Sequence, residues 1–456
     1  MLQSTGVQEE NTQDAARRKA EPQKAARRKK EVQKAVRKEA EQRETARQEE
    51  KTQKSVQQEA ARQKDERQNA AWKETEGDTA REEELREAVR FALRAAEALH
   101  AMPERAYQER ETTRFIRAAC EACGVVLLPL PTETGVWAWL SNGAPDTVLL
   151  RADIDAVPVG DGAAHRCGHD YHTASLLGAM RVLSAHRDAL LHNVAFLFQP
   201  AEECTSGMKS VLAAGLLDIL PQKPARVFGI HNRPEIPVGK IGVHPGALMA
   251  EKTNFMLSFL GKAGHGGSPQ TCIDPLVAAS AFVLGVQTIV SRNVDPQEAA
   301  VCSVCSMQAG DAPDLASDSA KLGGSVRTFR HAVHLRIMER VEQLAAHTAA
   351  AYECGWRLEW FPQVPAVENG TEMTEIARRA AVQVVGAENV IDPQPCLGSE
   401  DFAVLGSQLP SFFYWVGSGA PGRENGAWHT EAFRVADGYL DIAVPLLIRS
   451  AMEAEY

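Results

Sequence analysis

The sequence predicts an α/β domain that is interrupted by a smaller α+β unit and preceded by a charged helical arm. From about residue 124 to residue 243, short apolar strands alternate with helices, as a mainly parallel sheet covered by helices requires. Near Ala250 the pattern changes to a strand, a long apolar helix, two further strands and a second helix. From about Ala366 the chain returns to helix and strand, so we expect the α/β domain to be discontinuous.

The length supports this division, because 456 residues are too many for one ordinary hydrophobic core. We expect an arm over residues 1–81, an α/β domain over 82–249 and 364–456, and an inserted unit over 250–363. Within the arm, residues 14–73 repeat loosely and are rich in helix-forming and charged residues. The period of about ten residues matches neither the seven-residue nor the eleven-residue repeat of supercoiled helices, which favours a solvated, partly frayed helix. An oligomerisation or docking segment, or weak binding to an acidic surface, stays open as an alternative.

Composition and charge exclude several classes of protein. The net charge of −10 and the pI near 5.8 argue against nucleic-acid binding by the whole chain. The chain begins without the apolar segment of a signal peptide, and we expect no stretch that approaches the length of a membrane span. Nine scattered cysteines favour reduced thiols, and therefore a cytoplasmic protein. The pairs Cys120/Cys123 and Cys302/Cys305 lie in helical and strand-like patterns, so we attribute their spacing to coincidence.

The elements follow in order from about Glu82. Apolar residues at helical spacing begin the first packed helix, and a second helix surrounds Phe115. The remaining elements are strands at 125–128, 136–140 and 148–158 and a helix at 173–183, then, in the inserted unit, strands near 255–260, 300–307 and 323–329 and helices at 275–290 and 332–352.

One short stretch, Arg166–His172, carries three candidate metal ligands within a few residues. Thiolate and imidazole hold ions such as zinc, and the pair Cys167 and His169 can aim at one point because Gly168 permits a tight turn. Taken alone, a buried cysteine or histidine more often serves packing. Further candidates follow apolar strands elsewhere in the chain.

Those further candidates are Glu202 and Glu203 after one strand, His231 at the end of another, and His429 near the end of the chain. In an open parallel sheet the strand ends form the ligand crevice, where residues distant in sequence meet. We therefore expect two metal ions bound by Cys167, His169, Glu203, His231 and His429, with Glu202 left over as a base. Asp155, at a strand end, is expected to orient a ligating histidine, and capping of the next turn is the alternative.

These segments resemble the M20 family of metallopeptidases and amidohydrolases, in its branch of N-acyl-amino-acid amidohydrolases, hippurate hydrolases and auxin-conjugate hydrolases. The matching stretches, from about Leu99 to Val444, are LLRADIDAVP, CGHDYHTA, FLFQPAEE, GIHNRP, GKAGHGGSP with DPLVAAS, VSRNVDP, GGSVRTF, GSEDFA and WHTEAF. The resemblance implies a phosphorylase/hydrolase-like catalytic domain with an inserted lid, through which such proteins often form homodimers. It implies the same five ligands, Glu202 as general base, His265 reaching the reacting carbonyl, and Arg327 as a candidate substrate contact.

The expected activity is hydrolysis of the amide bond of small N-acyl amino acids or related amides. Zn²⁺ or Mn²⁺ is expected, and Co²⁺ or Ni²⁺ stays open, because mixed thiolate, imidazole and carboxylate sites accept several metals. The chain departs from the family at Asp314, where a substrate-binding asparagine is usual. A carboxylate there is expected to disfavour substrates with a free carboxylate nearby.

Two competing functions stay open at this point. A dipeptidase of the same family would show competition by free dipeptides. A non-catalytic metal-binding scaffold, with the arm as its functional part, would bind two metals without cleaving acyl amino acids.

Overall fold

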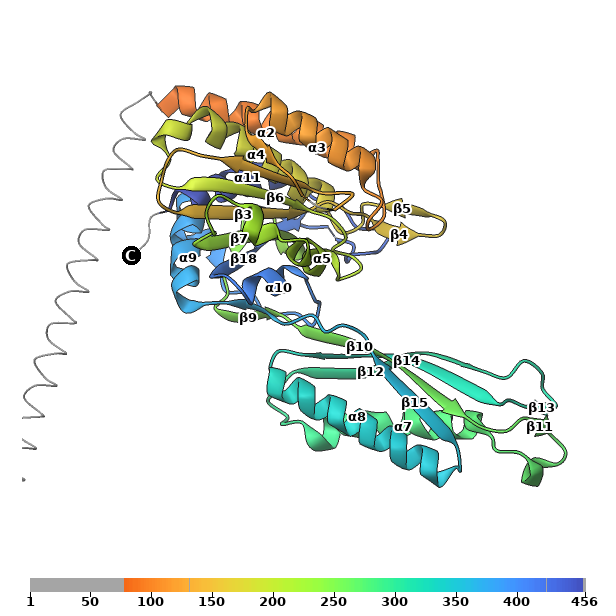
Figure 1. Cartoon of the computed structure of the whole chain (residues 1–456). Coiled ribbons are helices and arrows are strands. Elements are labelled where there is room, and N and C mark those ends of the chain that lie inside the picture. The colour runs from red at the N-terminus through yellow and green to blue at the C-terminus, as the bar shows by residue number, and fades with distance from the viewer. Residues whose placement is uncertain (1–77, 131, 424, 454–456) are drawn as a thin grey trace, which may run out of the picture. The chain divides into compact units, whose positions relative to one another are not determined.

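The computed structural model describes residues 78–130, 132–423 and 425–453, so the expectations for most of the arm lie outside the described residues. The larger sheet has eight strands in the order β1-β2-β6-β3-β7-β18-β8-β17 (Figure 1). The central strands β6, β3, β7 and β18 are parallel to one another, and β1 and β2 are antiparallel to their neighbours. The strands are β1 Val126–Leu128, β2 Val136–Leu140, β3 Thr147–Asp153, β6 Asn193–Gln199, β7 Arg226–Pro237, β8 Ile241–Gly242, β17 Val390–Ile391 and β18 Ser411–Gly419.

Both faces of this sheet are buried, which explains its nearly continuous apolar strands. In β2, Val136 and Ala138 join one hydrophobic cluster, whereas Trp137 and Trp139 join a second cluster on the other face. Successive side chains of a strand point to opposite faces, so alternate residues supply the two cores. The central strand β3 is likewise buried at every residue, so its carboxyl end lies between two packed layers.

Helices cover the two faces. The first cluster contains residues of α2, α4, α9 and α11, and the second contains residues of α5, α6 and α10. The helices are α2 Asp78–His100, α3 Arg110–Ala122, α4 His169–Ala185, α5 Gly207–Ala213, α6 Leu216–Ile219, α9 Thr371–Val385, α10 Phe402–Gly406 and α11 Tyr439–Met452, with short 3₁₀ turns at Arg187–Ala189 and Ala387–Asn389. Two small pairs, β4 Val157–Val159 with β5 Gly162–Ala164 and β9 Gly246–Met249 with β16 Val367–Asn369, complete this part.

The inserted unit, called the lid below, is a two-layer α+β structure with its own core. Four antiparallel strands in the order β12-β14-β10-β15 carry α7 and α8 on one face. Phe255, Phe282 and Ile337 are among the buried residues that join the sheet to both helices. Its elements are β10 Glu251–Leu260, β11 Gly264–His265, a 3₁₀ turn at Pro269–Thr271, α7 Pro275–Asn293, β12 Ala300–Ala309, β13 Leu315–Ala316, β14 Ser319–Thr328, α8 His331–Ala351 and β15 Gly355–Trp360. The α/β sheet with an inserted α+β unit therefore confirms the expected fold class.

Helix α7 corrects one expectation. Among residues 78–130, 132–423 and 425–453 it is the one helix long and apolar enough to cross a membrane by length and composition, with a hydropathy of 1.4 over its best window. Its inner face, which includes Ala278, Phe282 and Val286, is buried in the lid core. Core helices of soluble proteins pass the same test, so α7 is weak evidence for a membrane span.

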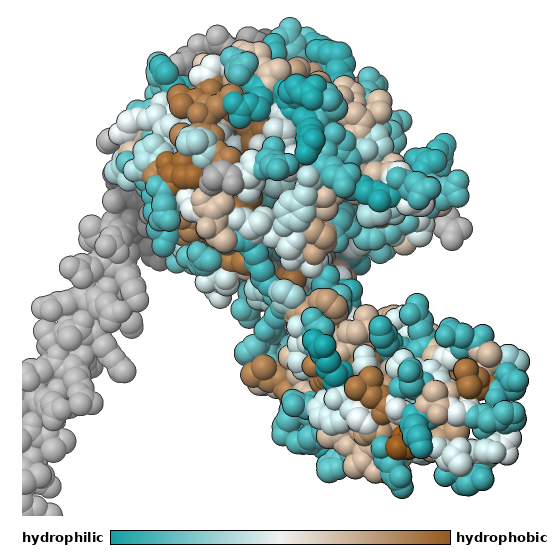
Figure 2. Space-filling model, turned by 45° about the vertical axis from the view of Figure 1, so that its right-hand side comes forward, coloured by the Kyte–Doolittle hydropathy of each residue, from teal (hydrophilic) through white to brown (hydrophobic). Residues whose placement is uncertain are grey.

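The outer face of α7 carries three exposed apolar side chains. Leu276, Val277 and Leu284 are 40%, 44% and 75% exposed. Figure 2 shows one face of the molecule, on which apolar side chains lie scattered among hydrophilic ones. Single exposed apolar residues are ordinary on protein surfaces, and these three share the outer face with exposed polar residues such as Ser280, Gln287 and Arg292.

Replacing Gly178 by valine is expected to destabilise the protein by about 2 kcal/mol. A Cβ atom at Gly178 in α4 would lie 2.9 Å from a Val444 methyl of α11 and 3.1 Å from Ala92 Cβ of α2, so these helices would have to separate. Urea unfolding followed by circular dichroism measures the change. Gly355→Ala in β15 is the control, because a Cβ there makes only ordinary contacts. Equal midpoints for the two variants would contradict this packing argument.

Candidate metal centre

The turn before α4 presents Cys167 and His169 to the same region. Gly168 between them has a φ of +88°, and it is the residue before the helix begins. A Cβ on Gly168 would lie 2.4 Å from the amide nitrogen of the Asn232 side chain, so glycine is required by both conformation and space. We predicted a helix from Thr173, but α4 starts at His169, which places that imidazole in the first turn. Cys167 and His169 are buried.

The other candidates come from the carboxyl ends of neighbouring strands. Glu202 and Glu203 follow β6, Asp153 ends β3, and His231 lies in β7, which is the order in which these strands stand in the sheet. His429 follows β18, the next strand, in a loop where it has a φ of +67°. Parallel strands place their carboxyl ends at one edge, and this edge therefore collects the side chains.

Their contacts join all six predicted residues into one cluster. Cys167 Sγ lies 3.6 Å from His231 Nε2, and His429 Nε2 lies 3.4 Å from Glu203 Oε2. His169 Nε2 lies 3.8 Å from Glu203 Oε1 and 4.0 Å from Glu202 Oε2. Within the described residues, five groups of three side chains lie close enough together to hold an ion. Three of them consist of predicted residues: Cys167 with His169 and His231, Cys167 with Glu203 and His429, and His169 with Glu202 and Glu203. The other two are Asp153 with His169 and His172, and Glu202 with Glu400 and Asp401.

The tautomers of two histidines leave lone pairs directed into the cluster. His169 Nδ1 lies 2.9 Å from the backbone oxygen of Asp155, and His231 Nδ1 lies 2.8 Å from the backbone oxygen of Asn232. A carbonyl only accepts, so each Nδ1 must donate, and in a neutral ring Nε2 is then unprotonated. His169 Nε2 and Glu203 Oε1 are buried without a hydrogen-bond partner. Buried polar atoms of this kind require an explanation, and a cation between them supplies one.

Asp155 contacts the cluster through both its carboxylate and its backbone oxygen. We expected its carboxylate to orient a ligating histidine, and that carboxylate lies 3.4 Å from His169 Nδ1. The backbone oxygen of Asp155 lies nearer to the same nitrogen, at 2.9 Å. The two carboxylate oxygens accept hydrogen bonds from the backbone amides of Glu202 and Glu203, each at 3.0 Å. Asp155 therefore holds the backbone of both acidic residues.

Sequence reasoning missed a chain of polar contacts behind the cluster. Asp153 Oδ1 accepts from His172 Nδ1 at 2.7 Å, and His172 Nε2 accepts from the Asn232 backbone amide at 2.9 Å. Trp428 Nε1 donates to Asn232 Oδ1 at 3.2 Å, immediately before His429. The spacing of His169 and His172 on one helix face was a signal, because residues three apart in a helix are neighbours.

A buried arginine was also missed. Arg151 is fully buried and forms ion pairs with Asp153 at 2.9 Å, Glu400 at 2.8 Å and Asp401 at 3.2 Å. It also donates to Gln199 Oε1 at 2.8 Å. A charged residue inside the apolar run of β3 was the available signal, since buried charges are normally paired.

Electrostatics around the cluster favour a cation. Burial, together with Glu400 and Asp401, raises the pKa of Glu202 well above its ordinary value. Burial and the nearby Glu400 raise the pKa of Asp401 to about 7. Burial also raises the pKa of the Cys167 thiol, and the carboxylate of Glu203 adds to this effect. Like charges crowded in a buried site repel one another, and a bound cation offsets that repulsion.

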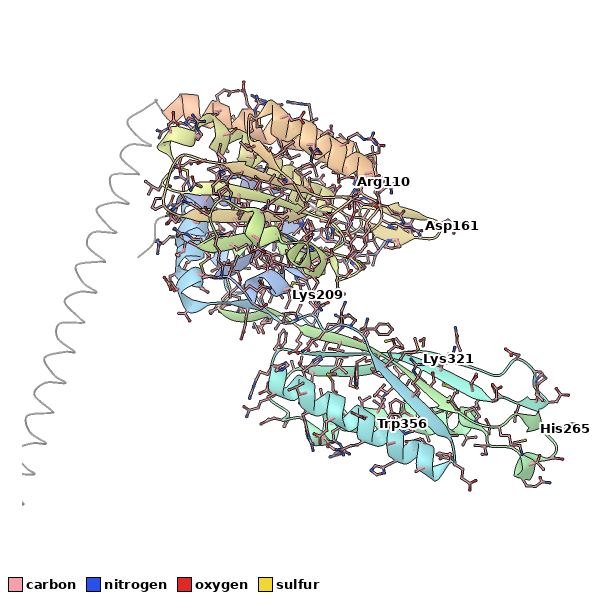
Figure 3. The ribbon with its side chains drawn as sticks, in the orientation of Figure 1. Arg110, Asp161, Lys209, His265, Lys321 and Trp356 are labelled. Carbon is pink, nitrogen blue, oxygen red and sulfur yellow. The ribbon has the colours of Figure 1, made fainter. Side chains whose placement is uncertain are left out.

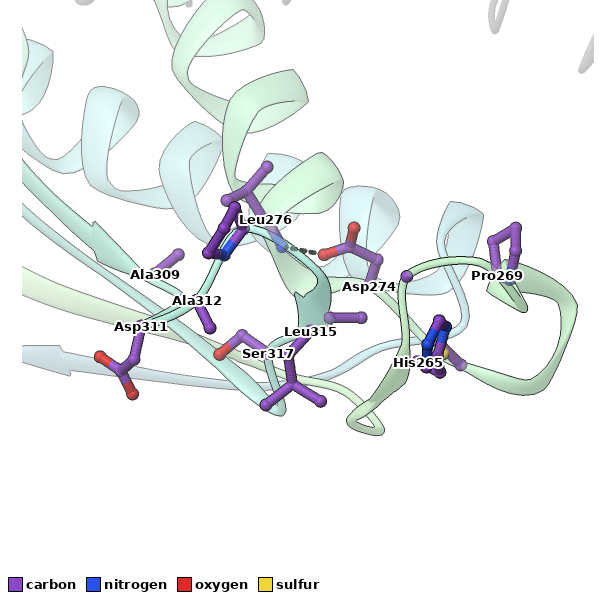
Figure 4. Close-up of a pocket in the computed structure, with 14 residues that line it drawn as sticks. His265, Pro269, Asp274, Leu276, Ala309, Asp311, Ala312, Leu315 and Ser317 are labelled. Atoms are coloured by element: carbon purple, nitrogen blue, oxygen red, sulfur yellow. Dashed lines mark hydrogen bonds between the residues drawn. The ribbon is translucent and has the colours of Figure 1, made fainter.

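The lid residues do not belong to the cluster. His265 lies in β11 at the tip of the lid, where its Nδ1 accepts a hydrogen bond from the Gly267 amide at 2.9 Å (Figure 3). It lines a cavity of about 510 Å³ formed by lid residues (Figure 4). Asp314 is close to His265, because its backbone oxygen accepts from the Gly266 amide at 2.7 Å. Arg327 in β14 donates to the backbone oxygen of Leu397 at 2.8 Å.

A largely parallel sheet whose carboxyl edge gathers thiol, imidazole and carboxylate donors defines a metal-binding α/β protein. A model of the family described as peptidase family M20/M25/M40 matches residues 149–451. N-acetylcysteine deacetylase from Bacillus subtilis (strain 168) is 39% identical over 362 residues, which cover 76% of this chain and 92% of the relative. IAA-amino acid hydrolase ILR1-like 2 from Arabidopsis thaliana is 32% identical over 373 residues, which cover 78% of this chain and 83% of that relative.

A solved structure agrees with these sequence matches. The crystal structure of a Bacillus subtilis dinuclear metal-binding peptidase of the M20 family has a TM-score of 0.68 and 32% identity, and the match covers 82% of this chain and 98% of that one. The chain therefore belongs to peptidase family M20, which confirms the resemblance, and it is a metal-dependent amidohydrolase. Two divalent ions agree with this neighbour and with the ligand groups found here.

Replacing Glu203 by alanine is expected to reduce bound metal from two equivalents to one or fewer. Its carboxylate approaches both His169 and His429, so its loss affects two of the three groups that consist of predicted residues. Elemental analysis by mass spectrometry after dialysis measures the stoichiometry. The matched control is Glu235→Ala, since this glutamate in β7 is 59% exposed and pairs with Arg233. Two retained equivalents in Glu203→Ala would contradict the assignment.

Proposed function

We propose that the protein hydrolyses the amide bond of small N-acyl amino acids or related amides. The ions are held by Cys167, His169, Glu203, His231 and His429. The observation that carries the proposal is the single cluster at the sheet edge, in which His169 Nε2 and Glu203 Oε1 are buried without partners and Glu202 lies beside them. Both named relatives act on acylated amino acids by their names, which supports the substrate class.

The donor set fits two divalent ions. One thiol, three imidazoles and a carboxylate suit Zn²⁺. The same mixed set of donors also accepts Mn²⁺, Co²⁺ or Ni²⁺. When bound, such ions lower the pKa of a water molecule and polarise the scissile carbonyl.

Glu202 serves as the general base and then as the general acid. Its carboxylate takes a proton from the attacking water and delivers it to the nitrogen of the leaving amine, which departs as the C–N bond breaks. Burial and the neighbouring carboxylates of Glu400 and Asp401 raise the pKa of Glu202, and a raised pKa strengthens this carboxylate as the acceptor of the proton in the first step. The amide of Asp401 lies 3.3 Å from Glu202 Oε1 and orients that carboxylate.

His265 completes the site from the lid of a second copy of the chain. It donates a hydrogen bond to the oxygen that becomes negative during attack, a contribution of about 3 kcal/mol. We propose a homodimer through the lid, and the exposed Leu276, Val277 and Leu284 on α7 supply an apolar surface for it. The glycines that flank His265 permit close approach of the substrate.

The proposed location is the cytoplasm. All nine cysteines are described, and each is a free thiol. Disulfides are rare where glutathione keeps thiols reduced, so a chain with nine free cysteines fits a reducing compartment.

Replacing Glu202 by glutamine is expected to lower kcat about 10²–10⁴-fold without loss of metal, because glutamine keeps the shape but transfers no proton. The assay is a panel of acylated amino acids tested with Zn²⁺, Mn²⁺, Co²⁺ and Ni²⁺. Glu121→Gln, on an exposed position of α3, is the control. Unchanged turnover by Glu202→Gln would exclude this mechanism.

The amide of N-acetylmethionine is expected to be turned over faster than the free acid. Asp314 lies beside the His265 turn, and its negative charge repels a nearby substrate carboxylate. Asp314→Asn should reverse the preference by raising kcat/KM for the free acid about tenfold, which corresponds to roughly 1.4 kcal/mol. Asp311→Asn, in the same loop, is the control. A wild-type protein that strongly prefers the free acid would rule out this role.

A further inference from the structure

We propose that Glu109 is a positioning residue for Glu202, a role that rests on the proposed function. Glu109 is fully buried and precedes α3, outside the residues that the family model matches. Its Oε1 accepts a hydrogen bond from the backbone amide of Ala201 at 2.8 Å. Ala201 is the residue immediately before Glu202, so this bond acts on the backbone that carries the base.

The loop that carries Glu202 needs such support because its backbone is strained. Ala201 has a φ of +59° and Thr205 a φ of +55°, and neither residue is glycine. The left-handed region costs an ordinary residue free energy, and it persists only where surrounding contacts enforce it. Gly207 closes the loop so tightly that a Cβ there would lie 1.9 Å from the Pro200 oxygen.

Three buried carboxylates enforce this conformation through backbone amides. Glu109 holds Ala201, Asp155 holds the next two residues, and Asp401 Oδ2 accepts from Met208 at 2.9 Å. Asp155 and Asp401 belong to the immediate surroundings of the cluster. Glu109 comes from a different segment of the chain, and it fixes the first amide of the loop.

Glu109 is itself held in place. Its Oε2 accepts from the Thr134 hydroxyl at 2.8 Å, so both oxygens are used. The same segment contacts the loop a second time, where Tyr107 Oη lies 2.8 Å from Ser206 Oγ. A buried carboxylate is costly unless it is hydrogen-bonded. The bond from Thr134 fixes the Glu109 carboxylate, and the bond from Ala201 joins it to the catalytic loop.

The consequence is a defined orientation of Glu202. Misplacement of a catalytic group by about 1 Å lowers turnover strongly, whereas ground-state binding of substrate is less affected. Loss of Glu109 should therefore lower kcat more than it changes KM. Glutamine should rescue much of the loss, because its carbonyl oxygen can accept from Ala201 and its amide can donate to Thr134.

The test compares Glu109→Ala, Glu109→Gln and the control Glu104→Ala on Mn²⁺-loaded protein, with the acyl amino acid that wild type turns over fastest. Glu104 lies in the same segment, but its carboxylate accepts from the amides of Glu111 and Thr112 and not from the loop. We expect Glu109→Ala to lose at least 100-fold in kcat, with KM within threefold and two metal equivalents retained. Glu109→Gln should stay within tenfold of wild type, and Glu104→Ala within threefold.

Several outcomes would overturn the proposal. They are a kcat of Glu109→Ala within threefold of wild type, an equal loss in Glu104→Ala, or a glutamine variant as impaired as the alanine one. If Glu109→Ala does not fold, Thr134→Val replaces it in the test. We expect its kcat to fall at least fivefold at unchanged KM, and an unchanged kcat would overturn the proposal. If the wild-type protein is inactive, the proposed function is refuted as well. If the wild-type protein and Glu109→Ala are both active and Glu202→Gln is inactive, only the positioning role is refuted.

Discussion

The ion pairs of Arg151 determine how the metal-binding edge is assembled. This guanidinium sits inside β3 with no exposure and joins Asp153, Glu400 and Asp401, which come from segments far apart in the chain. Several carboxylates buried close together would repel one another, and the fixed positive charge of Arg151 offsets that repulsion. Asp153 in turn contacts His172, and Asp401 contacts the loop of Glu202. The guanidinium of Arg151 thus connects, directly or through Asp153 and Asp401, the polar groups that surround the cluster.

Much of the fold was predictable because its signals are local. Apolar runs with alternate residues facing two cores, as in Val136 to Leu140, indicate strands buried on both faces. The shift near Ala250 revealed the inserted unit, since its strands alternate in burial as an antiparallel sheet with one covered face does. The start of α4 was placed too late. Gly168, the residue before the helix begins at His169, packs against the side chain of Asn232, and no local sequence pattern reports such a contact.

The candidate site was predictable as a set of residue types at strand ends, and the structure brings Cys167, Glu203 and His429 together. Its supporting contacts were not predictable, because they join segments distant in sequence through backbone groups. Glu109 illustrates the limit: it binds the amide of Ala201, and nothing in its own neighbourhood distinguishes it from a surface glutamate. Asp155 shows the same limit, since its position was recognised but the atoms it holds were not.

The two ends of the lid lie side by side, next to the small sheet of β9 and β16. Lys252 and Val364 exchange both of their backbone hydrogen bonds, each at 2.9 Å, so the start of β10 is paired with the segment that leaves the insertion after β15. A short reverse turn could join Lys252 to Val364 directly, so the insertion can be replaced as one unit. Evolution can therefore lengthen, replace or delete the unit and leave the parent fold intact, and new specificities can arise in such a lineage without rebuilding the catalytic core.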